Sequence, residues 1–173
     1  MSRDYPDWIQ PERAAQARRS FAGSMPLNRM PRVLDLLAED DSVHSGAIDF
    51  SIRFWLDDQR NVRADCALNG HVPLQCQRTL RPYAQPIEST ASLAIIESED
   101  RLSILPEDLE PKVCLDGQLN VAELIEDELI LALPLVPVDP ASEPMTKVGN
   151  EWDEAVEAPD AHPFADLANF RKS

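Results

Sequence analysis

The sequence contains few cysteines and glycines and no long apolar run, and each shortage excludes a class of protein. Its three cysteines are widely spaced and form no C-x-x-C pair, so we expect reduced thiols rather than a disulfide framework. Five glycines occur among 173 residues, and none builds a glycine-rich phosphate loop. No apolar run approaches the roughly 18 residues that a membrane helix needs, and the first residues lack the apolar core of a signal peptide. We therefore expect a cytoplasmic protein without a membrane partner.

Motifs for catalysis and for metal binding are also missing. The chain contains no H-E-x-x-H or G-x-S-x-G element, and nothing marks Cys66 and His71 as a nucleophile and its base. The acids Glu126, Asp127 and Glu128 could suggest a metal-dependent nuclease, but the solvated face of an amphipathic helix explains them more simply. Structural zinc needs about four closely paired Cys or His ligands, which the scattered residues here do not supply. We expect no enzyme, no catalytic residue, no metal and no cofactor.

Charge is distributed unevenly along the chain. The formal net charge is −15, with 16 Lys and Arg against 31 Asp and Glu. Residues 1–81 carry 11 of each sign, so the whole excess of acid lies in residues 82–173. An acidic surface repels phosphate backbones, so any RNA contact must use a local patch in the first half. The acidic half suits a basic protein partner, although acidity can equally serve solubility alone.

Two helices are expected before the first strand. Pro11 can occupy the first turn of a helix that runs to about Ala22, with Gly23 as its stop. Apolar residues at helical spacing from Met30 to Leu37 predict a second helix after Asn28.

The middle of the chain has the period of β-strands. Apolar residues alternate with polar ones over residues 47–56 and again over 62–68, with a turn-rich link at 57–61, which predicts a hairpin. Asn69-Gly70 is interpreted as a turn into a third strand at 72–76, and a fourth strand is expected at 87–95 after Pro86. A short strand is expected at residues 112–115. Short, locally connected strands usually form an antiparallel sheet.

The strongest predicted helix begins after Asn120. Asn120 and Glu123 form a cap signature, an apolar face follows over residues 121–133, and Pro134 ends the helix. Residues 139–173 are expected to be an acidic tail with prolines and a short terminal docking helix around Phe164 and Leu167. We divide the chain into a single domain of residues 1–138 and this tail.

These elements predict an α+β fold. We expect an antiparallel sheet of four to six strands, either open or closing toward a barrel. The C-terminal amphipathic helix and the N-terminal helices should pack on this sheet.

Three segments resemble a known family. LQCQRTLRP (74–82), LIEDELILALPLVPVD (124–139) and HPFADLANFRK (162–172) are similar to motifs of the YceD family of large ribosomal RNA subunit accumulation proteins, in the same order. The resemblance implies a role in synthesis, processing or stability of 23S ribosomal RNA in the bacterial cytoplasm, without a known catalytic activity. Many relatives carry a second cysteine three residues after the first, where this chain has Thr79. That departure argues against a metal site in this chain.

Arginine is the best candidate for RNA contact, because its guanidinium can bind a phosphate through two donors. Thirteen of the 16 basic residues are arginine. The proposed RNA-binding set lies in and after the predicted hairpin and consists of Arg53, Arg60, Arg63, Arg78 and Arg81. If the five converge, they form a basic patch beside Trp55 and Tyr83, which could stack bases. The alternative is that nearby aspartates neutralise them.

The predicted acidic helix offers a second kind of surface. Its acids could dock a basic large-subunit ribosomal protein, and the residues concerned are Glu123, Glu126, Asp127 and Glu128. Phe164 and Leu167 in the tail could anchor a partner or fold back on the domain. The sequence thus supports two functions: a factor that binds 23S ribosomal RNA or its precursor, and a protein-interaction adaptor that affects this RNA only indirectly.

Overall fold

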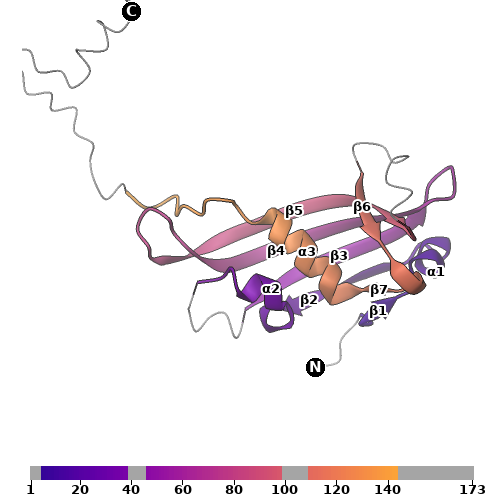
Figure 1. Ribbon diagram of the computed structural model, residues 1–173, viewed down its shortest axis with the longest axis horizontal. Helices are drawn as coiled ribbons and strands as arrows, with labels where there is room; N and C mark the ends of the chain where they lie inside the picture. The colour runs from indigo at the N-terminus through magenta and orange to yellow at the C-terminus, as the bar shows by residue number, and fades with distance from the viewer. Residues whose placement is uncertain (1–4, 39–45, 99–108, 144–173) are drawn as a thin grey trace, which may run out of the picture. The chain divides into compact units, whose positions relative to one another are not determined.

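The computed structural model describes residues 5–38, 46–98 and 109–143. They form an α+β fold, as predicted, within a compact unit that spans Met1–Glu143. A five-stranded sheet has the order β2-β3-β4-β5-β6, and β1 (Trp8–Ile9) pairs with β7 (Leu119–Asn120) in a second, two-stranded sheet (Figure 1). Within the described ranges the larger sheet stays open and does not close into a barrel. None of the described helices is both long and apolar enough to span a membrane.

The predicted hairpin is confirmed. β3 (Ala47–Leu56) pairs antiparallel with β4 (Val62–Gln75). The alternation works as expected, because Ile48, Phe50, Ile52 and Phe54 all point into the core and are at most 4% exposed.

Asn69-Gly70 is not a turn, so that prediction is wrong. β4 continues through Gly70 (φ 152°) and pairs along its length with β5 (Pro82–Ile96). Pairing with β3 ends at Gly70, and the two strands continue beyond it as a hairpin arm, which we define as His71–Pro86. An Asn-Gly pair favours a turn locally, but the ladder with β5 outweighs that preference.

The last strand of the larger sheet also differs from expectation. β6 (Glu110–Val113) runs parallel to β5, so the sheet is mixed rather than purely antiparallel. The short 3-10 helix η4 (Leu115–Gly117) follows it. Side-chain periodicity is the same for both strand directions, so the sequence pattern could not distinguish them.

The N-terminal helices are shorter than predicted. α1 (Pro11–Gln16) ends well before Ala22, and β2 (Ser20–Pro26) pairs with the edge of β3 in place of the predicted last helical turns. Arg18 has a positive φ of 47° at the corner between them. A 3-10 turn, η1 (Leu27–Arg29), and the single turn α2 (Pro31–Leu34) replace the second predicted helix.

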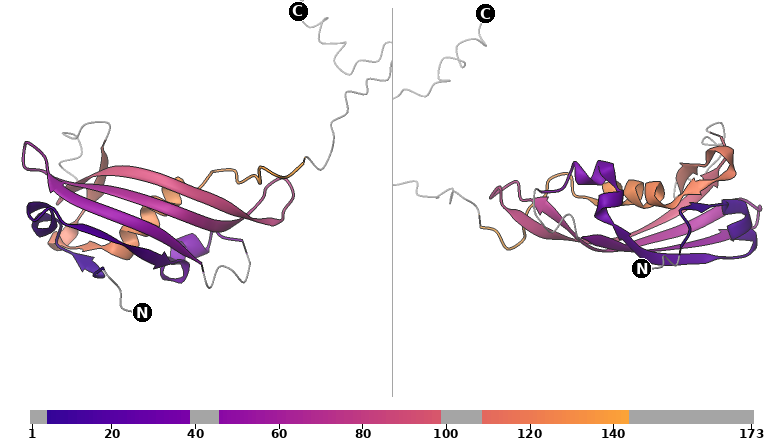
Figure 2. Two further views of the ribbon diagram at one scale, coloured as in Figure 1. Left: turned by 180° about the vertical axis from the view of Figure 1, so that it is seen from behind. Right: turned by 90° about the horizontal axis from the view of Figure 1, so that it is seen from below.

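The C-terminal helix is confirmed with its cap. α3 (Val121–Ala132) begins where Asn120 accepts hydrogen bonds from the N–H groups of Ala122 and Glu123, at 2.9 and 3.2 Å. Figure 2 shows α2 and α3 on the same face of the sheet, which we call the inner face. Phe164 and Leu167 lie outside the described residues, and the division of the chain at residue 138 stays a prediction.

Candidate nucleic-acid interface

The five predicted arginines do not form a single patch. Arg53, Arg60 and Arg63 lie near the β3–β4 turn, whereas Arg78 and Arg81 lie at the tip of the hairpin arm. Gln75 lies twelve positions after Arg63 along β4, which corresponds to about 40 Å of extended chain. The condition of convergence is therefore not met, because β4 is one long strand and not two short ones.

Arg53 lies on the outer face of the sheet beside an aromatic ring. Its Nη2 is 2.7 Å from Asp65 Oδ2, and its guanidinium carbon is 5.5 Å from the centre of the Trp55 ring. The Arg53 side chain remains 68% exposed. An exposed ion pair of this kind contributes little free energy, so the guanidinium can exchange Asp65 for a phosphate, and half-buried Trp55 lies next to it.

Arg63 is buried and organises the β3–β4 turn. Its Nε and Nη2 lie 2.9 and 2.7 Å from Asp57 Oδ2. Burial raises the pKa of Asp57, but hydrogen bonds from Asn61 and Arg63 outweigh it and lower that pKa overall. The alternative of neutralisation by an aspartate is therefore correct for Arg63, whereas exposed Arg60 (φ 65°) forms no ion pair within the described ranges.

Three arginines that the sequence analysis missed lie at the same end of the molecule. Arg13, Arg18 and Arg19 are exposed and form no ion pair with any described residue. The Arg19 carbonyl accepts a hydrogen bond from the Phe54 N–H at 3.0 Å, and the next residue pairs with Arg53 across β2 and β3. We call Arg13, Arg18, Arg19, Arg53 and Arg60 the arginine end.

A sequence signal for the missed residues does exist. The run from residue 13 to residue 34 contains five arginines and no carboxylate in a chain with 31 acids. The predicted helix up to about Ala22 rests on Pro11 and Gly23 and not on this charge pattern. The absence of acid over such a stretch is the better indicator of an anion-binding surface.

The tip of the hairpin arm is held by the segment after α3. The Gln77 N–H donates to the Pro137 carbonyl at 2.8 Å, and Arg78 Nη1 donates to the Ser142 carbonyl. Arg81 is exposed, and half-buried Tyr83, whose hydroxyl donates to Gln85 at 2.7 Å, packs against the core.

Cys76 at the base of this tip is surrounded by donors. The Asp139 N–H donates to its sulfur at 3.3 Å, and the Ser142 hydroxyl lies 3.7 Å from it. Hydrogen bonding from the Thr79 side chain is the largest of the effects that, against burial, lower the pKa of the thiol to about 6. The Thr79 hydroxyl thus stabilises the thiolate, and the described residues contain no group of three or more potential metal ligands.

The acids of α3 do not form a solvated face, so that prediction is wrong. Glu126 and Glu128 are 4% and 5% exposed. Glu126 accepts hydrogen bonds from the Arg32 N–H at 2.6 Å and from Arg32 Nε at 3.0 Å. Asp127 forms ion pairs with Arg32 and Lys112. These contacts tie α3 to α2 and β6.

Glu128 is buried without a hydrogen-bond donor among the described residues. Burial, and next the nearby charge of Glu110, raise its pKa to about 7. Of the four acids predicted to dock a basic protein, Glu123 alone is classed as exposed. The available acidic surface on α3 is therefore much smaller than the sequence suggested.

Comparisons with known proteins agree on one family. The family model described as "Large ribosomal RNA subunit accumulation protein YceD" matches residues 64–171. A curated protein of that name from Haemophilus influenzae is 31% identical over 171 residues, which cover 95% of this chain and 94% of the relative. No solved structure matches the chain significantly.

Proposed function

This chain belongs to the YceD family of large ribosomal RNA subunit accumulation proteins, and from that premise we propose that it supports synthesis, processing or stability of 23S ribosomal RNA by binding rather than by catalysis. It would act in the cytoplasm, where this RNA is made. The name of the family supports the identity of the RNA. The arrangement of arginines on this chain supports the binding mode.

The arginine end is the observation that carries this proposal. Arg13, Arg18, Arg19 and Arg60 are exposed and form no ion pair with described residues, so RNA phosphates would not have to displace a carboxylate there. Arg53 and Trp55 lie beside them on the outer face, where a base could stack on the ring. The rest of the chain is acidic, so it would orient the RNA toward this end.

Salt-dependent binding of a 23S RNA fragment tests the proposal. Each lost phosphate contact should reduce the slope of log K against log salt by about 0.7 to 0.9. We therefore expect the triple variant Arg18→Gln, Arg19→Gln, Arg53→Gln to lose about two units of slope or more and to bind at least tenfold more weakly. The matched control, Arg78→Gln with Arg81→Gln, removes charge only at the arm tip. Equal binding by the wild type and the triple variant would contradict direct RNA contact at the arginine end.

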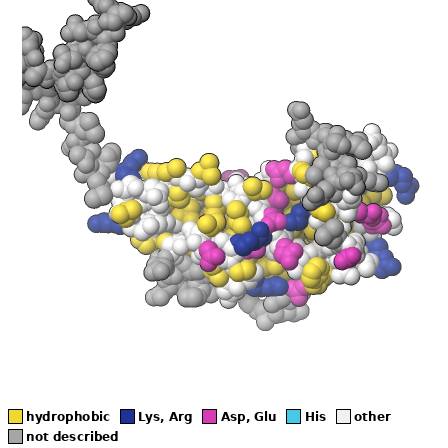
Figure 3. Space-filling model, in the orientation of Figure 1, with side chains coloured by type: hydrophobic (Ala, Val, Ile, Leu, Met, Phe, Trp, Pro, Cys, Tyr) yellow, Lys and Arg dark blue, Asp and Glu magenta, His cyan; other side chains and the backbone are white. Residues whose placement is uncertain are grey.

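A second function is favoured by an exposed apolar surface. Leu131, Leu135 and Val136 at and after the end of α3 are 71%, 101% and 65% exposed, and Figure 3 shows apolar side chains gathered on this side of the molecule. Exposed aliphatic clusters commonly mark protein–protein contacts. This surface supports the alternative of an adaptor for a basic large-subunit ribosomal protein. A complex that survives ribonuclease treatment would favour it.

A further inference from the structure

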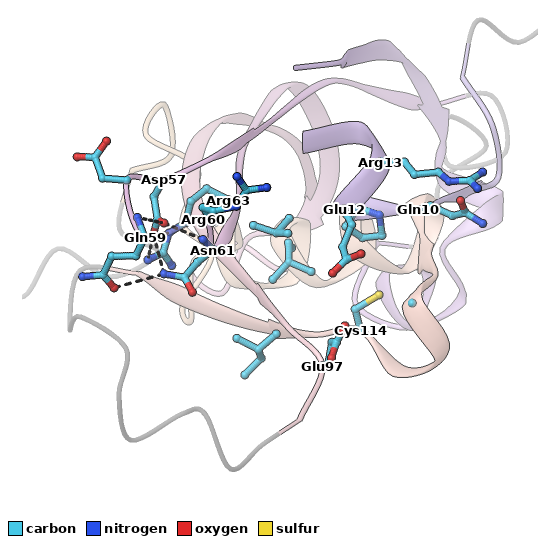
Figure 4. Close-up of a pocket in the computed structure, with 16 residues that line it drawn as sticks. Gln10, Glu12, Arg13, Asp57, Gln59, Arg60, Asn61, Arg63, Glu97 and Cys114 are labelled. Atoms are coloured by element: carbon cyan, nitrogen blue, oxygen red, sulfur yellow. Dashed lines mark hydrogen bonds and ion pairs between the residues drawn. The ribbon is translucent and has the colours of Figure 1, made fainter. Parts of the chain in front are cut away.

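A cavity opens at the arginine end that the sequence analysis did not predict. It has a volume of about 840 Å³, within the range of roughly 300 to 1,000 Å³ that is typical of ligand pockets. Figure 4 shows Asp57, Arg60, Asn61 and Arg63 of the β3–β4 turn on one side, with Glu12 and Arg13 of α1 opposite them. Val62, Ile95 and Ile96 add an apolar wall.

Arg63 is one of the residues that line this cavity, and its guanidinium has one unsatisfied donor. Its side chain is 9% exposed, and its Nε and Nη2 both contact Asp57 Oδ2. Nη1 is the nitrogen that points away from that carboxylate, and it is buried without a hydrogen-bond partner among the described residues. Native structures rarely leave a buried donor unpaired, and a water, an ion or a ligand can supply the partner.

The lining does not suit a free anion. Three arginines line the cavity together with four acids (Glu12, Asp57, Asp58 and Glu97) and three side-chain amides (Gln10, Gln59 and Asn61). A bare phosphate would meet nearby carboxylates, whereas a neutral, flat ligand with both donors and acceptors would meet complementary groups on apolar walls. A nucleobase has that chemistry, and RNA-binding proteins commonly hold unpaired bases by their edges.

We propose that this cavity binds one unpaired nucleobase of RNA, with Arg63 Nη1 donating to an acceptor on the base edge. This proposal rests on the proposed function and specifies the kind of RNA that it needs. Exposed Arg60 lines the same cavity and provides a second guanidinium for the base edge. Guanine should bind best, because it offers an acceptor to Arg63 Nη1 and N–H donors to a carboxylate of the lining.

Binding of a short RNA duplex with one bulged guanosine, compared with the fully paired duplex, tests this idea. We expect the bulge to improve binding at least tenfold, a bulged uridine to improve it less, and inorganic phosphate not to compete. Arg63→Lys keeps a charge near Asp57 but lacks Nη1, and should abolish the gain from the bulge. Ile95→Trp should fill the cavity and also abolish the gain from the bulge, without altering the ion pair between Arg63 and Asp57. Arg81→Gln at the distant arm tip is the matched control, and thermal unfolding checks that each variant is folded.

The possible outcomes distinguish the nucleobase site from the proposed function of RNA binding at the arginine end. Equal binding of bulged and paired duplexes by the wild type would overturn the nucleobase site. If the 23S fragment then still binds through Arg18, Arg19 and Arg53, the proposed function stands without it. Competition by guanosine monophosphate with no gain from a bulge would overturn RNA as the source and leave a free nucleotide as the ligand. A gain from the bulge that persists in folded Arg63→Lys and Ile95→Trp would show that the base binds elsewhere, which also overturns the proposal.

Discussion

Three consecutive acids of α3 occupy three different environments. Glu126 accepts hydrogen bonds from N–H groups of α2, Asp127 pairs with Arg32 and Lys112, and Glu128 is buried without a donor from the described part of the chain. A helix carries side chains around its whole circumference, so neighbours in sequence need not share a face. A run of acids in a helix is therefore poor evidence for an acidic surface.

Glu128 should make stability depend on pH. Its pKa is raised from 4.5 to about 7, so the folded state resists deprotonation and stability falls as the pH rises from about 4.5 to 7. We expect Glu128→Gln to unfold in urea with about 2 to 3 kcal/mol more stability than the wild type at pH 8, and with little difference at pH 4.5. Glu123→Gln on the exposed side of α3 serves as the control. A gain that is the same at both pH values would show that charge burial is not its cause.

Cys76 should titrate as an unusually acidic thiol. The hydrogen bond from the Thr79 side chain is the largest cause of its lowered pKa of about 6. Because this pKa is depressed from 9.0, the thiolate stabilises the fold fully above about pH 9, and the effect is lost as the pH falls through 6. In a variant that keeps Cys76 as its only cysteine, ultraviolet thiolate absorbance should show a midpoint near 6. Adding Thr79→Val should move the midpoint upward, and Thr90→Val on β5 should not.

At the scale of elements, the continuous β4 strand determines how far the hairpin arm extends. Gly70 allows that continuity, because its φ of 152° is rare for residues with a side chain. An added Cβ would also lie 3.0 Å from Ile48 Cδ1. The same residue that suggested a turn in the sequence thus keeps the strand unbroken in the sheet.

Replacing Gly70 by alanine should destabilise the protein. We expect a loss of about 1 to 2 kcal/mol in the free energy of unfolding, from backbone strain and the contact with Ile48. Chemical denaturation of Gly70→Ala measures this loss, with exposed Asn69→Ala as the neighbouring control. A Gly70→Ala protein as stable as the control would show that the strand tolerates a side chain at this position.

At the scale of the whole molecule, the basic surface and the exposed apolar surface lie at different places. The arginine end surrounds the β3–β4 turn, and the exposed aliphatic residues lie at the far end of α3. One molecule could therefore contact RNA at one place and a protein at another. The net charge of −15 would favour a basic protein.

Affinity capture from a lysate should separate these contacts. With the full-length chain as bait, ribonuclease treatment should remove ribosomal proteins that RNA alone connects to it. A basic ribosomal protein that remains should be lost with Leu135→Asp and Val136→Asp and retained with Arg18→Gln and Arg19→Gln. If nothing remains after ribonuclease treatment, the adaptor function is excluded and RNA binding alone accounts for the partners.

The sequence by itself determined the elements whose signals are local. The alternation from Ile48 to Phe54 defined β3, Asn120 and the apolar stripe defined α3, and the charge count placed the acid in the second half. Only the tertiary structure decided the parallel direction of β6, the strand in place of residues 20–22 of the predicted helix, and the separation of Arg63 from Arg78. It also buried Glu126 against Arg32, a partner 94 residues away. Local periodicity records which side of an element is apolar, whereas these outcomes depend on pairings between distant segments, whose energies no local pattern contains.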